Sequence, residues 1–351
     1  MYTLDDIHPD LLHPSHLNGR TEGGVFSYIA RSPELAQILA RAYGREGLCL
    51  KMFKRDAQPL DEFYWGNTGN LLTDCTKAQN LFALEGFAPR VYDIALVNGT
   101  HWAQVTDYVT DDGGKFDRAA CRTQVVDRYQ VRTRGGDQNP ANWIGSQMVD
   151  FQHHFVHPAY EVALKRRCTA GAAWGARSDA YQAAGLAMDS QRASAAERAS
   201  AMGWDEVDFA GATVLDVGCN LGEMCQEAHD RGARRVVGVD LPHVAKLAYE
   251  VANWRSYWNL DFVGAQLPSG SGQIAQQTGI DVFDIVLALS AKQTKPDPWA
   301  FALCKRVCFF EGHVPDREET WRPVLERRFE RVEFLGATRD HGVRPVFRCW
   351  R

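Results

Sequence analysis

The chain has 351 residues, a length that suits about two domains of ~150 residues each. Hydrophobic residues make up 45% and charged residues 24%, so the composition is that of a folded globular protein and excludes a disordered, collagen-like or coiled-coil chain. With 39 Lys and Arg against 44 Asp and Glu, the net charge of −5 disfavours general binding to nucleic acid through long-range electrostatics.

The first 152 residues alternate short strand-like runs with turn-rich pieces, which predicts a small α+β domain. The strand-like runs are GLCLKMFK, which carries Lys51, PRVYDIALV and HWAQVTDYV, and AQNLFALEGF between the first two has the character of a helix. Further along, GGDQNPANWIGSQMVDFQ places Asp137 and Asn142 at a D-x-x-P-x-N spacing and then forms a strand that ends at Asp150.

This order and spacing resemble the protein-kinase and aminoglycoside-phosphotransferase superfamily. The resemblance implies that Lys51 pairs with the phosphates of ATP and that Asp137 is the catalytic aspartate. It also implies metal-binding roles for Asn142 and Asp150. If the domain is active, these four residues form its site, and we expect no other metal site in the chain.

The chain departs from that superfamily in two respects. Ala78 and Gln79 stand where a helix should supply the acidic partner of the lysine, and the stretch from Tyr108 to Asp137 is too short for the large helical lobe. We therefore expect a truncated, degenerate kinase-like domain that acts as a binding or dimerisation platform. Active phosphotransfer stays open as an alternative, as does an unrelated α+β domain in which Asp137 is merely a turn residue.

Residues 153–210 are rich in Ala and Arg, as in YEVALKRR and SDAYQAAGLAMDSQRASAAERASAMGW. These residue types have high helix propensity, and no strand-like run interrupts them. The segment is predicted to be a helical connector between two domains.

From residue 211 to residue 351, strand-like runs alternate with helical ones. The strand-like runs are ATVLDVG, VVGVD, LDFVG, DIVLALS, VCFFEG, RVEFLG and PVFRCW. This alternation predicts an α/β fold, a doubly wound Rossmann-like parallel sheet, because each parallel crossover needs a connecting helix. The last two runs are too close in sequence for such a crossover, so they predict a terminal antiparallel hairpin.

A turn that contains glycine follows the first of these strands. The strand Thr213–Val217 leads into Gly218 and Gly222, and a helix is expected to begin at about Glu223. Glycine tolerates positive φ and lets the backbone approach a ligand, and Asn220 between the two glycines is the non-glycine residue type best suited to such a conformation. The pattern predicts a ligand-binding turn at the carboxyl end of the strand.

Two acidic residues accompany the turn. Asp240 ends the second strand, ~20 residues beyond the glycines, where a carboxylate holds the hydroxyls of a ribose. Asp216 lies within the turn motif itself, where it would repel a pyrophosphate but attract an ammonium group. The ammonium group of an amino acid therefore fits better here than a dinucleotide, and a plain strand-turn-helix without a ligand is the remaining alternative.

These motifs resemble those of class I S-adenosylmethionine-dependent methyltransferases, whose first motif is similar to LDVGCNLG and whose second is similar to VVGVD. The resemblance covers the C-terminal domain and implies S-adenosylmethionine as the cofactor. The chain departs from the family at Asn220, which replaces the middle glycine, and at Gln266, where an acid often binds the adenine and where the side-chain carbonyl of Gln266 could accept instead. The residues that the resemblance places at the cofactor are Asp216, Gly218, Cys219, Asn220, Gly222, Asp240, Leu241, Gln266 and Leu289.

The catalytic candidates follow the fourth and fifth strands, because ligands bind at the carboxyl ends of strands in such sheets. Methyl transfer is an in-line displacement, so the enzyme mainly positions the acceptor and removes its proton. His313 is the preferred base, since imidazole titrates near neutral pH, and Lys292 and Glu311 are the other candidates. For His313, a solvated loop residue without a catalytic role is the alternative.

We interpret the chain as a methyltransferase in three parts: a kinase-like domain over residues 1–152, a helical connector over residues 153–210 that covers the cofactor, and a methyltransferase domain over residues 211–351. A methyltransferase joined to a kinase-like domain resembles enzymes that modify glycans, which implies a sugar hydroxyl in a glycan or carbohydrate-containing metabolite as the acceptor. RNA methylation, a bifunctional kinase-methyltransferase and a non-catalytic scaffold that binds the cofactor stay open. A homodimer is compatible with a platform role for the first domain.

The cysteines and the N-terminal segment bear on the compartment. Nine cysteines lie scattered between Cys49 and Cys349 without a C-x-x-C pair, so neither a disulfide framework nor a zinc ribbon is expected. The N-terminal segment lacks the basic start and apolar run of a signal peptide, and no stretch approaches the ~18 apolar residues of a membrane span. We expect a cytoplasmic protein with a small-molecule or glycan partner and no general nucleic-acid binding.

Overall fold

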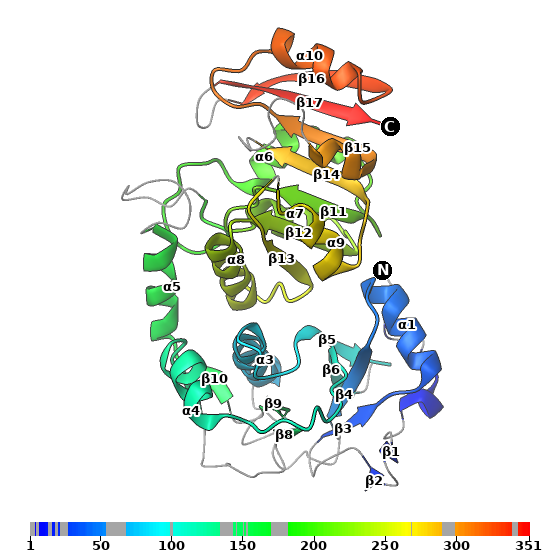
Figure 1. Cartoon of the computed structure of the whole chain (residues 1–351), viewed down its shortest axis with the longest axis vertical. Helices are drawn as coiled ribbons and strands as arrows, with labels where there is room; N and C mark the ends of the chain where they lie inside the picture. The colour runs from blue at the N-terminus through cyan, green and yellow to red at the C-terminus, as the bar shows by residue number, and fades with distance from the viewer. Residues whose placement is uncertain are drawn as a thin grey trace. The chain divides into compact units, whose positions relative to one another are not determined.

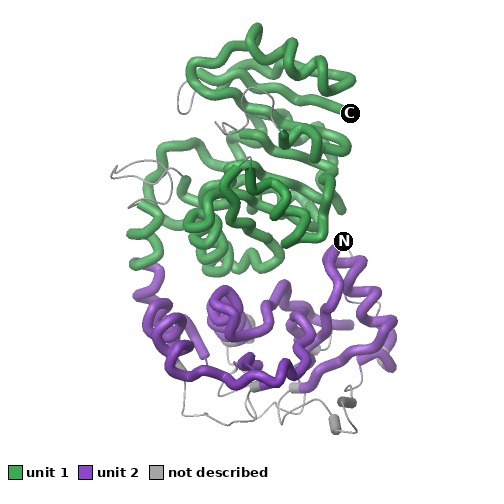
Figure 2. Tube along the Cα trace, viewed as in Figure 1, with its two compact units in different colours: residues 1, 163–351 green, residues 2–162 purple. Residues whose placement is uncertain are grey.

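The computed structural model of the chain forms two compact units, residues 2–162 and residues 163–351 with residue 1, which Figure 2 distinguishes by colour. The structure describes all residues except 1–3, 5–6, 13–15, 18–19, 22–26, 54–67, 99–100, 134–142, 145, 150, 152–153, 170–181, 268, 290–298 and 339–342. Segment 163–210 belongs to the same compact unit as the C-terminal sheet. The division into residues 1–152, 153–210 and 211–351 stays a prediction.

The larger unit is built on a seven-stranded sheet with the strand order β13-β12-β11-β14-β15-β17-β16 (Figure 1). Its strands are β11 (Thr213–Val217), β12 (Arg235–Asp240), β13 (Leu260–Gly264), β14 (Phe283–Leu289), β15 (Cys304–Glu311), β16 (Arg331–Thr338) and β17 (Arg344–Trp350). Strands β11 to β15 pair in parallel, and β17 lies antiparallel between β15 and β16. The doubly wound Rossmann-like sheet and the terminal hairpin predicted from the sequence are therefore confirmed.

Helices cover both faces of this sheet. The helices of this unit are α5 (Ala159–Thr169, which begins in the smaller unit), α6 (Ala195–Ala201), η6 (Trp204–Glu206), α7 (Glu223–Asp230), α8 (Pro242–Trp254), α9 (Gly272–Thr278), η8 (Trp299–Leu303) and α10 (Glu318–Glu326). Helix α7 begins at the residue predicted for it, directly after Gly222, whose φ of 78° is in the left-handed region. The strand-turn-helix around the glycines is thus formed as the local sequence predicts.

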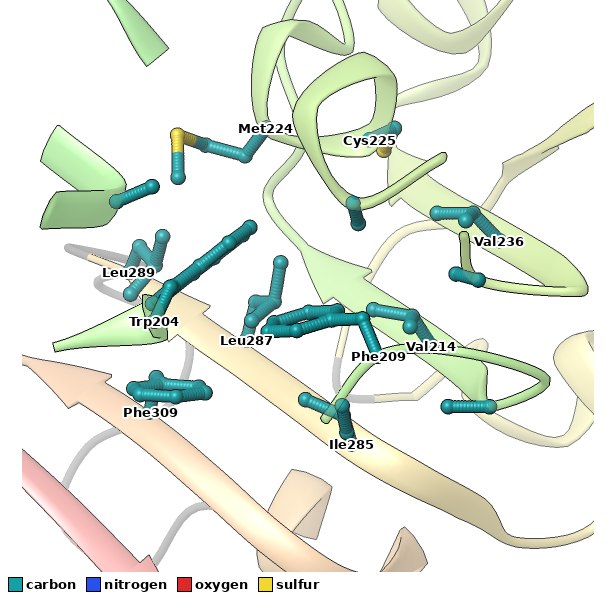
Figure 3. Close-up of a cluster of buried hydrophobic side chains, with 14 of the residues drawn as sticks. Trp204, Phe209, Val214, Met224, Cys225, Val236, Ile285, Leu287, Leu289 and Phe309 are labelled. Atoms are coloured by element: carbon teal, nitrogen blue, oxygen red, sulfur yellow. The ribbon is translucent and has the colours of Figure 1, made fainter. Parts of the chain in front are cut away.

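One face of the sheet packs against α6, η6 and α7. Figure 3 shows the centre of this core, where the indole of Trp204 stacks on Phe209 with ring centroids 4.7 Å apart and Phe309 lies alongside. Met224 and Cys225 of α7 belong to the same cluster. This core fixes the helix that follows the glycine turn against the strands that carry the predicted site.

The opposite face packs against α9, η8 and α10. Here Phe310 of β15 lies between Trp321 of α10 and Phe301 of η8, with centroid distances of 4.4 Å and 5.8 Å. Phe309 and Phe310 are neighbours in sequence and are buried on opposite faces. Because both faces are covered, successive strand residues are apolar, which explains the continuous apolar runs in the sequence.

The connector contains a strand as well as helices. Residues His154–Val156 form β10, which pairs antiparallel with β7 (Val131–Thr133) in the smaller unit. Within the larger unit, Ala184 and Gly185 adopt positive φ in a turn before α6. The expectation of a connector without strands is wrong, because pairing with a segment elsewhere in the chain, and not local propensity, determines the conformation of residues 154–156.

The smaller unit contains a four-stranded antiparallel sheet with the order β3-β4-β6-β5. Its elements are η2 (Pro9–Leu12), β1 (His16–Leu17), β2 (Arg20–Thr21), β3 (Ser27–Ala30), α1 (Pro33–Tyr43), β4 (Leu48–Phe53), α3 (Thr68–Leu84), β5 (Val91–Val97), β6 (His101–Asp107), α4 (Arg118–Cys121), the π-helix η4 (Arg122–Asp127), β7, β8 (Trp143–Ile144), β9 (Gln147–Met148) and β10. The α+β character and the strands on either side of α3 are as predicted.

Local sequence explains where α1 begins and ends, and a side-chain contact explains how α3 is attached to this sheet. Helix α1 begins at a Ser32 cap, whose hydroxyl accepts from Leu35 N at 3.0 Å, and ends at Gly44, whose φ is 65°. Helix α3 is held to β5 by Asn80, which donates to Val91 O and accepts from Val91 N.

Among the described residues, no helix combines the length and apolarity needed to cross a membrane.

Candidate functional site

The carboxyl ends of four parallel strands of the larger unit bring the predicted site residues to one edge of the sheet. Strands β11, β12, β14 and β15 are parallel neighbours, and register pairs such as Val217 with Val239 and Leu289 with Glu311 align their ends. The turn after β11 and the last residue of β12, Asp240, therefore lie at the same edge as the loop after β15. Fold geometry thus assembles residues that are distant in sequence.

The turn after β11 is attached to the neighbouring strand through its backbone. The N–H groups of Gly218 and Cys219 both donate to Val239 O, at 2.8 Å and 3.1 Å. Gly218 has a φ of 77° and Asn220 a φ of 52°, so the conformations predicted for a glycine and an asparagine are both present. The Asn220 side chain stabilises its own turn by accepting from Leu221 N at 2.9 Å.

Close packing explains why residues 222 and 238 are glycines. A Cβ atom on Gly222 would lie 2.7 Å from the ring of Phe262, and one on Gly238 would lie 2.8 Å from the sulfur of Cys219. Rigid neighbours at such distances exclude a side chain. Gly222 therefore lets the start of α7 approach β13, and Gly238 lets β12 approach the turn.

Asp240 connects the end of β12 to the turn. Its Oδ2 accepts from Asn220 N at 2.8 Å, and its Oδ1 accepts from Leu241 N at 2.7 Å. Burial raises the pKa of Asp240, while these two backbone hydrogen bonds and the charge of His243 oppose that rise. A carboxylate offers about four lone-pair positions, so two remain for a diol.

Asp216 is almost completely buried beneath the turn, at 3% exposure. The thiol of Cys225 donates to its Oδ2 at 3.4 Å. Burial raises the pKa of Asp216 to about 7, the Cys225 hydrogen bond and the charge of Arg198 oppose the rise, and Asp240 adds to it. Near neutral pH this carboxyl group is thus poised between its two protonation states.

The connector supplies polar residues that the sequence analysis did not identify. Gln182 Oε1 accepts from Glu223 N in the first turn of α7 at 3.4 Å. Burial raises the pKa of Glu223, and the charge of Arg198, a hydrogen bond from the Ala184 backbone and the charge of Arg192 oppose the rise. Glu223 directly follows the second turn glycine, which is the signal that could have identified it. No local signal marks the connector residues.

Glu311, a predicted catalytic residue, lies in a buried cluster of arginines at the end of β15. Arg192 Nη2 lies 3.1 Å and 3.2 Å from its two carboxylate oxygens, and Thr338 Oγ1 donates to Oε1 at 2.6 Å. Arg198 and Arg344 lie 3.7 Å and 3.9 Å from Oε2. The Glu311 side chain is 0% exposed. Its surroundings favour charge pairing, and its catalytic role stays a prediction.

His313 lies in the partly exposed loop after β15. Its backbone N–H donates to Asp316 Oδ2 at 2.7 Å, and the same oxygen accepts from Trp321 Nε1 at 3.0 Å, which attaches the loop to α10. The ring Nδ1 lies 2.9 Å from Val314 O. A carbonyl can only accept, so Nδ1 carries the hydrogen in that contact and Nε2 of the neutral ring keeps its lone pair.

The remaining predicted residues differ in their surroundings. Cys219 is buried beside the turn, Leu289 ends β14 in the core, and Gln266 has an exposed side chain after β13. Lys292, Asp137, Asn142 and Asp150 lie outside the described residues. Their roles stay predictions.

In the smaller unit, Lys51 lies on β4 as predicted and is 7% exposed. Its Nζ donates to Val149 O at 2.9 Å. At the positions where an acidic partner was missing in sequence, Ala78 is fully buried and Gln79 donates to Pro89 O at 2.9 Å. The lysine is thus held at the backbone of the residue that precedes Asp150.

Comparisons with known proteins give no matching protein-family model and no matching curated protein. Among solved structures, magnesium protoporphyrin IX methyltransferase from Synechocystis PCC 6803 with bound SAM is 18% identical, with a TM-score of 0.34 over 45% of this chain and 77% of that chain. The bifunctional kinase-methyltransferase WbdD is 16% identical, with a TM-score of 0.36 over 46% of this chain and 40% of that one. The T. thermophilus 16S rRNA methyltransferase RsmC is 18% identical, with a TM-score of 0.33 over 44% of this chain and 40% of that one. The matches thus span less than half of the latter two chains.

Proposed function

We propose that the larger unit is an S-adenosylmethionine-dependent methyltransferase. The observation that carries the proposal is the contact between Asp240 and the turn: an acid at the end of the second strand accepts from Asn220 N and has lone pairs left for a ribose. The order of the strands places this contact at the carboxyl edge, where ligands bind in open α/β sheets.

The residues present fit that cofactor. Asp240 would hold the ribose hydroxyls, and the buried acids Asp216 and Glu223 would face the ammonium group of the methionine part. The Oε2 atom of Glu223 is buried without a hydrogen-bond partner among the residues that the structure describes, so a cationic group there would satisfy it. When bound, the cofactor supplies an electrophilic methyl group. The chain's own part is to position the acceptor and to take its proton.

We propose a sugar hydroxyl, in a glycan or carbohydrate-containing metabolite, as the acceptor. What supports it is the resemblance of the first domain to kinase-like enzymes that accompany glycan modification. A hydroxyl must lose its proton on methylation, and His313, in the loop after β15, has a ring nitrogen whose lone pair can take it. Lys292 and Glu311 stay the other candidates.

Incubation of a cell extract with the protein and isotopically labelled S-adenosylmethionine tests the proposal. We expect one labelled methyl group, found by mass spectrometry, on a compound that releases a methylated sugar after acid hydrolysis. A labelled nucleoside would instead favour RNA methylation. Calorimetric binding of the cofactor without transfer to any fraction would favour the scaffold alternative.

Asp240→Ala should weaken cofactor binding, because it removes a charge-assisted hydrogen bond to the ribose. Such bonds contribute about 1.5–3 kcal/mol, which corresponds to a roughly 10- to 150-fold rise in Kd. Titration calorimetry of the wild-type and variant chains measures the change. Asp261→Ala is a matched control on the next strand, since Asp261 pairs with Arg235 away from the carboxyl edge. Equal affinity of wild type and Asp240→Ala would remove the ribose assignment.

The affinity for the cofactor should rise with pH. The ammonium group requires an ionised partner, and burial raises the pKa of Asp216 in the free protein to about 7. Below that pKa, binding must first remove a proton, so affinity should increase roughly tenfold between about pH 5.5 and pH 7 and fall again above about pH 8, where the α-amino group of the ligand loses its own proton. Calorimetry over this range, in two buffers of different ionisation enthalpy, should also detect the released proton. A flat profile would contradict the assignment of Asp216.

Phosphotransfer by the smaller unit is a second candidate function. The hydrogen bond from Lys51 to Val149 O favours it, because it holds the lysine beside the segment that carries the predicted metal ligand Asp150. Calorimetry with ATP and Mg²⁺ tests it, with Lys77→Met as the control for Lys51→Met. Binding that Lys51→Met abolishes would support a bifunctional kinase-methyltransferase. If the wild-type chain does not bind ATP with Mg²⁺, phosphotransfer is excluded and the platform role is the proposal that is left for the smaller unit.

A further inference from the structure

We propose that residues 182–186 of the connector form a strap that closes the first turn of α7 and must leave it before the cofactor can bind. The inference rests on the function proposed for the larger unit and assigns a regulatory role to the connector. A segment that covered the bound cofactor would add to the affinity, whereas the strap lowers it.

Two hydrogen bonds attach the strap to helices of the larger unit. At its start, Gln182 Oε1 accepts from the N–H of Glu223, the first residue of α7, at 3.4 Å. Three residues later, Arg255, which directly follows α8, donates from Nη1 to Gly185 O at 2.9 Å. The Gln182 side chain is buried, but its hydrogen bond is longer than the usual 2.7–3.2 Å. The strap is thus packed against the unit through a contact that is readily exchanged.

The strap contains a tight turn that its own residues do not favour. Leu186 N donates to Ala183 O at 2.9 Å, and the two residues between them, Ala184 and Gly185, have φ values of 47° and 72°. A turn with two positive φ values suits Asn or Gly at both central positions, so Ala184 is strained there. A strained residue persists only where its surroundings hold it, and Ala184 is fully buried. Tertiary contacts therefore keep the strap in place, and local preference does not.

The turn that the strap closes carries an acid that the ammonium group of the cofactor would need. Glu223 is 8% exposed, and its Oε2 is buried without a hydrogen-bond partner among the residues that the structure describes. Such an acceptor is unfavourable until a donor reaches it. An ammonium group could reach it only if the segment held at Glu223 N moved aside. The strap and the cofactor therefore compete for the same helical turn.

Competition fixes the direction of each expected effect. The apparent Kd equals the intrinsic Kd divided by the fraction of molecules whose strap is open. Weakening the strap raises that fraction, so it tightens cofactor binding, whereas weakening a cover would loosen it. Ligand binding should likewise expose the backbone amides of the strap to solvent.

Titration calorimetry of the full chain with S-adenosylhomocysteine tests the first effect. Arg255→Met removes the donor to Gly185 O, and Gly185→Ala adds a Cβ that would lie 2.6 Å from Cζ of Arg255. Each variant should lower Kd by about 2- to 10-fold, the effect of losing one hydrogen bond. The matched controls are Arg322→Met on α10 and Gly279→Ala, where φ is also positive and an added Cβ would meet no neighbour. Both should bind like wild type.

Hydrogen exchange of the wild-type chain gives a second readout. Without ligand, the Leu186 amide should be protected by its hydrogen bond to Ala183 O. Saturating S-adenosylhomocysteine should speed exchange in peptides that contain residues 182–186, whereas a cover would exchange more slowly. The Gly279 amide, bonded to Ala275 O at the end of α9, should exchange at the same rate with and without ligand.

Two results overturn the inference, and they are distinguishable from failure of the proposed function. One is an unchanged or higher Kd in both Arg255→Met and Gly185→Ala, and the other is unchanged or slower exchange of the strap on ligand binding. If the variants do not fold, exchange in the wild-type chain decides alone. Wild type and variants that all bind no ligand would remove the proposed function and the inference with it, whereas binding by the variants alone would support both.

Discussion

Glu311→Gln is expected to lower the free energy of unfolding of the larger unit by about 3–5 kcal/mol. The Glu311 carboxylate is 0% exposed and has Arg192, Arg198 and Arg344 within 4 Å. Glutamine keeps the size and one acceptor of the side chain but removes the charge, which leaves three buried guanidinium groups without their shared counter-ion. The cost of an uncompensated buried charge is the reason for the large expected effect.

Urea denaturation followed by tryptophan fluorescence measures this change, because Trp204 lies in the core beside β15. Glu318→Gln is the matched control. Glu318 also pairs with an arginine, Arg322, but both side chains are about one-third exposed, so water takes over the lost interaction and the stability should change little. Equal stability of wild type and Glu311→Gln would show that the cluster tolerates excess charge.

The same residue marks the limit of what the sequence predicts. The sequence predicts a place for Glu311 after the fifth strand, whereas it is the last residue of β15. The expected place at the carboxyl end of that strand led to a catalytic interpretation. The arginine that lies nearest to it, Arg192, is 119 residues away in sequence and belongs to a connector with no motif. Which arginines surround a carboxylate is decided by tertiary packing, which no spacing along the chain reveals.

At the glycine turn, by contrast, the sequence alone predicted the local structure correctly. Gly218, Asn220 and Gly222 adopt the left-handed conformations predicted for them, and α7 begins at the expected residue. The reason is that a strand, a turn and a helix that follow one another are determined by neighbouring residues. In β10, by contrast, the partner strand lies elsewhere in the chain, and the prediction for that segment was wrong.

The loop after β15 is where a catalytic substitution is expected to have its largest effect. His313→Ala should reduce kcat by roughly 10²- to 10⁴-fold, the usual contribution of a general base. Nδ1 of the ring contacts Val314 O at 2.9 Å, so the lone pair of the neutral imidazole is on Nε2. The Asp316 carboxylate fixes the loop from the other side by accepting from His313 N at 2.7 Å. The contacts that position the base are therefore with its own loop and, through Asp316, with α10.

The second part of the prediction is an unchanged Kd for the cofactor, because the proposed role of His313 concerns the acceptor alone. His313→Gln should behave like His313→Ala, since an amide nitrogen can hydrogen-bond to a hydroxyl but cannot take its proton. His229→Ala, at the end of α7, controls for the loss of an imidazole elsewhere in the unit. A His313 variant with normal kcat would show that the acceptor loses its proton to another group, and Lys292 would then become the first candidate. A variant with reduced cofactor affinity would show that the loop contacts the cofactor itself, because removing a base that acts only on the acceptor changes kcat and leaves cofactor binding intact.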